Sequence, residues 1–173
     1  MGGTQSRTND YRADRNISTP VGPRDYSGSG FDRGHLVPAA DMKINRQAMS
    51  ETFFMTNMTP QRPGFNRGIW QSLERTMRKL VASKGLAYVI TAPILANGLP
   101  RLPKNIAIPE SYYKIAYFPK TQEMWAYLIP NFSQKGRKLQ EFLVSVDEIE
   151  TLTGIDFYSQ LPDALEDRLE ALP

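Results

Sequence analysis

The strongest constraint on the fold of this chain is an apolar stripe between residues 66 and 83. Ile69, Leu73, Met77 and Leu80 recur at spacings of four, four and three residues, which places them on one side of an α-helix. Gly85 follows directly as a C-terminal stop signal. The pattern therefore predicts a long helix over residues 66–83 whose stripe packs against a core.

Segments with strand-forming or continuous apolar composition lie on both sides of this helix. We expect strands at 31–37, 53–56, 86–92, 112–118 and 124–129. The last two are joined by a short polar turn, which predicts a hairpin. The strand at 53–56 is expected to stop near Pro60, and the strand at 86–92 ends at Pro93.

Three shorter helices are predicted from their end signals. Asn45 is placed to cap a helix over residues 46–51, and Asp147 to cap one that ends at Gly154. Asp163 and Glu166 form a capping-box-like start for a final helix. Mixed helices and strands without an internal repeat predict an α+β fold.

Composition limits the classes of protein that this chain can belong to. With 173 residues, 40% hydrophobic and 23% charged, it suits one compact domain over residues 1–173, with an irregular region over residues 1–30. The net charge of +3 fits a polyanionic partner without requiring one. No run approaches the roughly 20 apolar residues of a membrane helix, and the first 30 residues lack a signal-peptide core.

The ligand inventory restricts any metal site to oxygen donors. There is no cysteine, so disulfides and thiolate ligands are excluded, and the single histidine excludes a His-rich zinc site. Oxygen ligands suit Mg²⁺, which commonly keeps several waters and needs few protein ligands. Mn²⁺ is an alternative ion.

That single histidine, His35, lies in the tetrapeptide Asp32-Arg33-Gly34-His35. An imidazole with an unperturbed pKa of ~6.5 can accept a proton from water near neutral pH. Arg33, two residues earlier, falls on the same face of an extended strand and can neutralise an attacked phosphate. This pairing suits phosphodiester hydrolysis. The alternative is a structural histidine with a satisfied hydrogen bond.

Asn66 and Glu74 are the candidate metal partners on the predicted helix. Together with Arg78 they fall within an arc of about 120°, so one helix directs all three toward one surface. In a regular α-helix Asn66 and Glu74 are about 12 Å apart along the axis. We therefore predict that Asn66 binds the ion directly and Glu74 acts through metal-bound water. The alternatives are a helix N-cap for Asn66 and a solvated carboxylate for Glu74.

Other polar and aromatic residues nearby are interpreted as structural. Gly28, Gly30 and Gly34 do not have the spacing of a phosphate-binding loop. Asp32 and Asp41 are expected to hold arginines and backbone near the site. The tryptophans and the Tyr112-Tyr113 pair are expected to lie in the core.

Several motifs together resemble the DNA/RNA non-specific endonuclease family, which includes mitochondrial endonuclease G and secreted bacterial nucleases. They extend over most of the chain: Asp32-Arg33-Gly34-His35, Thr56-Asn57-Met58-x-Pro60-Gln61, Asn66-x3-Trp70-x2-Leu73-Glu74, Ile90-Thr91-Ala92-Pro93, Ile129-Pro130-Asn131 and Val144–Glu150 with Thr153-Gly154. The resemblance implies a ββα-metal (His-Me finger) core with a mainly antiparallel central sheet flanked by helices.

The resemblance also implies roles for individual residues. His35 is the general base, Asn66 the direct ligand of Mg²⁺, and Glu74 its partner through water. Arg33 and Arg78 match the phosphate-stabilising arginines. Arg7, in Arg7-x3-Tyr11-x2-Asp14, matches an upstream arginine that reaches the scissile phosphate, and Asn57 matches an asparagine that supports the site. Family members usually carry more residues before that arginine than the six found here.

The implied substrates are DNA and RNA, cut with little base or sugar preference to leave 5′-phosphate and 3′-hydroxyl ends. A homodimer, a protein inhibitor, and an exported or organellar location are consistent with the family. Two alternatives stay open: a catalytically silent module that binds nucleic acid or docks an inhibitor, and a phosphodiesterase acting on small nucleotides or lipids.

Overall fold

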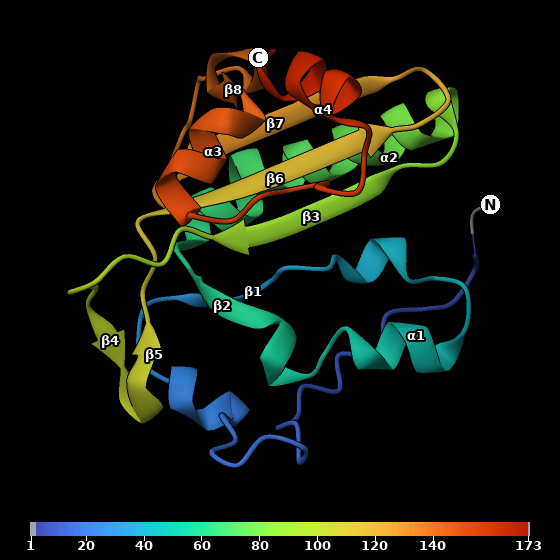
Figure 1. Ribbon diagram of the computed structural model, residues 1–173. Helices are drawn as coiled ribbons and strands as arrows, with labels where there is room; N and C mark the ends of the chain where they lie inside the picture. The colour runs from blue at the N-terminus through green and yellow to red at the C-terminus, as the bar shows by residue number, and fades with distance from the viewer. Residues whose placement is uncertain (1–2, 173) are drawn as a thin grey trace.

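The computed structural model describes residues 3–172, and its strands form one large and two small antiparallel sheets (Figure 1). The large sheet has the strand order β3-β6-β7-β8, formed by Tyr88–Pro93, Ser111–Phe118, Glu123–Pro130 and Leu143–Val144. Strand β1 (Asp32–His35) pairs with β2 (Met58–Gln61), and β4 (Arg101–Leu102) pairs with β5 (Ile106–Ala107). This confirms the predicted α+β class.

Helices cover both faces of the large sheet. The α-helices are α1 (Arg46–Glu51), α2 (Gln71–Lys84), α3 (Val146–Thr153) and α4 (Asp163–Glu170). A π-helical segment, η4 (Phe65–Trp70), leads directly into α2. Short 3₁₀ turns lie at Pro23–Tyr26, Ala39–Asp41, Met55–Asn57, Pro103–Asn105 and Leu139–Phe142. None of the helices in residues 3–172 is long and apolar enough to cross a membrane.

Two hydrophobic clusters form because successive side chains of β6 point to opposite faces of the sheet. Tyr112, Ala116 and Phe118 pack with the residues of η4 and α2. Tyr113, Ile115 and Tyr117 pack with residues of α3 and α4. Figure 1 shows α2 behind the large sheet and α3 and α4 on its other side. The buried Tyr112 and Tyr113 confirm that this pair belongs to the core.

The clearest helical predictions are confirmed. Asn45 caps α1 by accepting a hydrogen bond of 2.8 Å from the Ala48 amide. The apolar stripe buries Leu73 and Met77, and α2 ends where Gly85 adopts a φ of +93°. The helix differs from the prediction at its start, where residues 65–70 are π-helical.

Two predicted helix caps are wrong in detail. Ser145, rather than Asp147, caps α3, because its hydroxyl accepts a hydrogen bond of 3.1 Å from the Glu148 amide. Helix α4 begins at Asp163 itself, and no side-chain capping bond forms there.

The strand predicted at 53–56 is also wrong. Phe54 makes only an isolated bridge to Arg12, and Met55–Asn57 is a 3₁₀ turn. The strand is β2, and Pro60 lies within it, opposite Arg33. A proline is tolerated because β2 pairs on one side only, so no second neighbour needs its missing N–H. The apolar residues that begin at Phe53 are explained by burial in the core rather than by a strand, since Phe53 is fully buried.

Hydrogen bonds from buried side chains attach β2 to the large sheet. The Tyr112 hydroxyl donates to the Pro60 carbonyl at 2.8 Å. The Asn131 amide donates to the same carbonyl at 3.0 Å, and its oxygen accepts from the Arg62 N–H at 2.9 Å. These contacts fix where the chain leaves β2 and enters η4, and so place β1, β2 and the helix relative to one another.

Candidate active site

A cleft of about 560 Å³ lies between the N-terminal segment, β1 and the η4–α2 helix. Its walls combine segments that are far apart in sequence. Six of the seven predicted site residues line it: Arg7, Arg33, His35, Asn66, Glu74 and Arg78. The structure therefore brings together the side chains that the sequence placed on one strand, one helix and the N-terminal region.

His35 ends β1 and is held by two aromatic rings. Its imidazole lies edge-on to Phe53, with ring centroids 5.0 Å apart, and 6.0 Å from the Tyr11 ring. The Nε2 atom is buried and has no hydrogen-bond partner among residues 3–172. Burial and the nearby charge of Arg7 lower the pKa of His35 to about 4. The imidazole is therefore neutral at pH 7 and can accept a proton.

Asn57 is the predicted residue that does not line the cleft. Its side-chain oxygen accepts from the Val37 N–H at 2.9 Å, and its nitrogen donates to the carbonyls of Val37 at 3.0 Å and Thr52 at 2.9 Å. These bonds hold the chain two residues beyond His35. Asn57 therefore has the geometry of a supporting residue.

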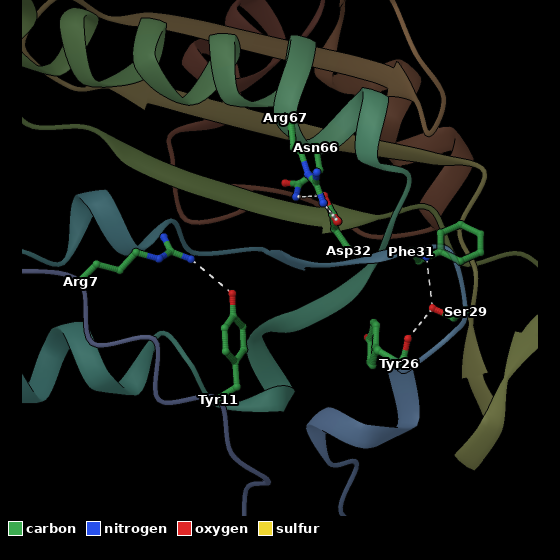
Figure 2. A network of polar contacts seen from close by, with 8 residues as sticks. All are labelled: Arg7, Tyr11, Tyr26, Ser29, Phe31, Asp32, Asn66 and Arg67. Carbon is green, nitrogen blue, oxygen red and sulfur yellow. Dashed lines mark hydrogen bonds and ion pairs between the residues drawn. The ribbon is translucent and has the colours of Figure 1, made fainter.

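Asn66 is oriented by a contact with β1. Its amide nitrogen donates to Asp32 Oδ2 at 2.9 Å, and Arg67 donates to both oxygens of the same carboxylate (Figure 2). Because the nitrogen is engaged, the Asn66 carbonyl oxygen is the atom left for a ligand. The alternative of an N-cap is wrong, since Gly64 precedes the helix and Asn66 lies inside it.

The π-helical segment changes the spacing between Asn66 and Glu74. Gly68 interrupts it with non-helical angles, φ −104° and ψ −109°. The separation of about 12 Å expected for a regular α-helix therefore does not apply to this pair. π-helical turns recur at functional sites.

Glu74 is half-buried on the cleft side of α2. Burial raises the pKa of its carboxyl group, and the positive charge of Lys114 opposes that rise. The environment therefore disfavours a bare Glu74 carboxylate and makes a nearby cation favourable.

Two of the cleft arginines are paired with carboxylates. Arg67 contacts Asp32 at 2.5 Å, and Arg78 contacts Asp41 at 2.8 Å. The expectation that Asp32 and Asp41 hold arginines beside the site is confirmed.

The other two cleft arginines have no carboxylate partner among the described residues. Arg7 donates to Asn9 at 2.7 Å and to the Tyr11 hydroxyl at 3.3 Å (Figure 2). The Arg33 guanidinium lies 4.5 Å from the centre of the Tyr11 ring. Both guanidinium groups can therefore bind an anion without first breaking an ion pair.

The sequence interpretation missed Lys114, which is 2% exposed beneath α2. Its ammonium group donates to the Thr91 hydroxyl and lies 5.2 Å from the centre of the Trp70 ring. Burial lowers its pKa to about 8, against the opposing effect of Glu74. Strand alternation contains the signal for this residue, because it places Lys114 on the same face as Tyr112 and Ala116.

The donor atoms at the cleft fit a hard divalent cation. The free carbonyl oxygen of Asn66 and the carboxylate of Glu74 are oxygen ligands of the kind that Mg²⁺ prefers. A second acidic group, Asp147, Glu150 and Glu170, has its carboxylates within 4.8 Å of one another, but it lies on α3 and α4 and forms no part of the cleft.

The fold and the cleft together define a ββα-metal (His-Me finger) protein: an antiparallel strand pair that carries a histidine, followed by a helix that carries an asparagine. Residues 2–164 match the family model for DNA/RNA non-specific endonucleases. The chain belongs to this family.

Relatives with known names agree with this assignment. The chain is 33% identical to a nuclease of Nostoc sp. over 98% of its own length and 66% of the relative. It is 34% identical to human mitochondrial endonuclease G, over 77% of this chain and 50% of that protein. It is 30% identical to a Serratia marcescens nuclease, over 96% of this chain and 68% of that protein.

A solved structure of the EndoG/EndoGI complex, described as showing the mechanism of EndoG inhibition, has the same fold. It matches with a TM-score of 0.82 and 27% identity, over 88% of this chain and 70% of that one. The chain spans between about half and two thirds of the length of the first curated relatives it matches.

Proposed function

We propose that the protein is a Mg²⁺-dependent endonuclease that hydrolyses phosphodiester bonds of DNA and RNA with little sequence or sugar preference. The observation that carries this proposal is one cleft holding a neutral histidine, an asparagine with a free carbonyl oxygen and two arginines without carboxylate partners. Groups of this kind bind phosphate rather than base edges, which accounts for the low sequence specificity that we propose.

His35 acts as the general base. Its neutral imidazole removes a proton from a water molecule as that water attacks phosphorus. The bond from phosphorus to the 3′ oxygen breaks on the opposite side, and this leaving oxygen takes up a proton from solvent water. His35 then returns its proton to solvent. The products are a 5′-phosphate, which contains the attacking oxygen, and a 3′-hydroxyl.

The arginines stabilise the additional negative charge on the phosphoryl oxygens. Arg7 and Arg33 are free to bind the scissile phosphate, and Arg78 assists from α2. Asn66 would hold Mg²⁺ directly and Glu74 through water, and a bound ion would supply positive charge that stabilises the leaving oxygen. Asn57 keeps the chain after His35 in place.

A plasmid-nicking assay tests the proposal. The protein should convert supercoiled DNA to nicked and linear forms with Mg²⁺, with Mn²⁺ as an alternative ion, and lose activity in EDTA. His35→Ala should abolish cleavage while binding persists, and Asn66→Ala should lose the metal-dependent activity. Full activity in EDTA, or a full rate in His35→Ala, would refute the mechanism.

The nicking assay with and without Mg²⁺, together with a DNA-binding measurement, tests the first alternative, and a comparison of cleavage of long DNA, RNA and a dinucleotide tests the second. A silent binding module would bind DNA without cutting it. A small-molecule phosphodiesterase would cut a dinucleotide but not long DNA or RNA.

We also propose that residues 1–173 act as one catalytic domain with nucleic acid as partner. A protein inhibitor is a further candidate partner, because one of the matching solved structures is an inhibitor complex. A homodimer and an exported or organellar location stay predictions; several relatives are named as mitochondrial.

A further inference from the structure

A second groove, of about 510 Å³, lies beside the cleft on the other flank of the η4–α2 helix. Its floor is formed by residues 63–75, and its far wall by the loop of residues 133–137. Arg67 lines both the cleft and this groove. An extended ligand that leaves the cleft past Arg67 would therefore enter the groove directly.

The groove is lined by four cations and by no acidic residue among those described. The cations are Arg67, Arg75, Lys135 and Arg137. Arg67 is held by Asp32 and Arg137 by Glu141. Each of these two side chains is more than half exposed, so each still presents positive charge to the groove.

Arg75 and Lys135 carry the uncompensated charge. Among residues 3–172, Arg75 donates only to the neutral side chains of Gln71 and Ser72, at 2.9 and 3.0 Å. Lys135 is exposed and makes no ion pair within residues 3–172. One of these cations is on the helix and the other on the opposite wall, so a polyanion in the groove contacts both.

We propose that this groove binds the backbone phosphates of the substrate that flank the scissile bond, on the side of the cleft marked by Arg67. This assignment rests on the proposed nuclease function. It identifies the substrate as a polynucleotide of several nucleotides. Phosphate contacts of this kind increase affinity for every sequence equally and release counterions.

The test compares two double variants with equal loss of charge. Arg75→Gln/Lys135→Gln removes the two unpaired groove cations. Lys79→Gln/Lys120→Gln removes two exposed lysines that line neither the cleft nor the groove. Each is assayed with a dinucleotide and with a single-stranded 20-mer of DNA.

The groove variant should lose about tenfold in kcat/KM on the 20-mer, through KM, and keep its rate on the dinucleotide. Its salt dependence should be shallower by about 1.4 in log Kd against log salt, the value for two phosphate contacts on a single strand. Binding is measured by fluorescence anisotropy in the His35→Ala background, which does not cut the probe. The control variant should have the same kcat/KM as the wild type on both the dinucleotide and the 20-mer.

Equal kcat/KM values and equal salt slopes for the groove and control variants would overturn the groove assignment. A wild-type protein that cuts neither substrate would instead refute the nuclease function, and the anisotropy measurement would still decide whether the groove binds the 20-mer.

Discussion

The Asn66 amide donates a hydrogen bond of 2.9 Å to the carboxylate of Asp32, which lies 34 positions earlier in the chain. This contact joins the strand that carries His35 to the helix that carries the candidate metal ligand. It also engages the side-chain nitrogen of Asn66 and leaves the side-chain oxygen free. Asp32 is therefore placed to orient Asn66, the proposed metal ligand.

Asp32→Ala should raise the Mg²⁺ concentration needed for half-maximal activity by about tenfold or more. Loss of a residue that hydrogen-bonds a metal ligand commonly lowers metal affinity by that factor. A magnesium titration of the cleavage rate measures this. Asp10→Ala, which removes a carboxylate paired with Arg12, is the matched control. An unchanged magnesium requirement would show that Asp32 does not orient the ligand.

The single histidine provides a direct test of the charge state at the cleft. Its imidazole resonance should titrate near pH 4, well below the pKa of ~6.5 of a free side chain. Arg7→Gln should raise that midpoint, because a neighbouring positive charge is removed. NMR titration of His35 measures both values. A wild-type midpoint at or above pH 6.5 would show that burial and Arg7 do not lower the pKa of His35.

The lowered pKa of His35 also makes stability depend on pH. Between about pH 6.5 and pH 4 the unfolded chain binds a proton that the folded protein does not. The contribution of His35 to the free energy of unfolding should therefore decrease as pH falls through this window. His35→Ala should remove that part of the slope in denaturant titrations.

Lys114→Met should affect activity more at low pH than at high pH. Lys114 lowers the pKa of Glu74, so its loss leaves Glu74 protonated to a higher pH. The acid side of the rate profile should therefore move to higher pH. Stability should fall by about 1–3 kcal/mol at every pH, because the Thr91 hydroxyl and Glu74 lose a buried partner. Cleavage rates from pH 5 to 9 measure this, with Lys120→Met as control. A uniform loss at every pH would exclude the proposed effect on Glu74.

Gly34→Ala should destabilise the protein by about 1–3 kcal/mol, the usual cost of overpacking. A Cβ at this position would lie 2.1 Å from Gln61 Cδ, and Gln61 is fully buried and cannot move aside. Thermal unfolding measures the loss. Gln61→Ala in the same chain should recover part of it. If the double variant is no more stable than the sum of the two single changes predicts, the contact is not the cause.

Glu170→Gln should stabilise the protein at pH 8–9 and have little effect near pH 4. Burial and neighbouring acidic groups, Glu150 first among them, raise the pKa of Glu170 to about 8. An acid with a raised pKa contributes less stability as pH rises from 4.5 toward that value. A gain of at least ~1 kcal/mol, or about 2–4 °C in Tm, is expected at the higher pH. An equal effect at both pH values would contradict it.

The sequence alone determined the elements whose signals are local. The stripe at Ile69, Leu73 and Met77 predicts α2, and the strand-forming runs predict β6 and β7, because side-chain periodicity depends only on neighbours along the chain. The candidate roles of His35, the single histidine, and of Asn66, an amide on the predicted helix, are also proposed from residue type and spacing. These residues meet in the cleft as expected.

Tertiary structure decided what depends on distant contacts. The position of β2 is set by its pairing with β1 and by Tyr112, not by the apolar run before it. The free carbonyl of Asn66 depends on Asp32, and the environment of Glu74 depends on Lys114, a strand residue 40 positions later. Hydrogen bonds and charge interactions act through space, so no local pattern in the sequence specifies which residues will share them.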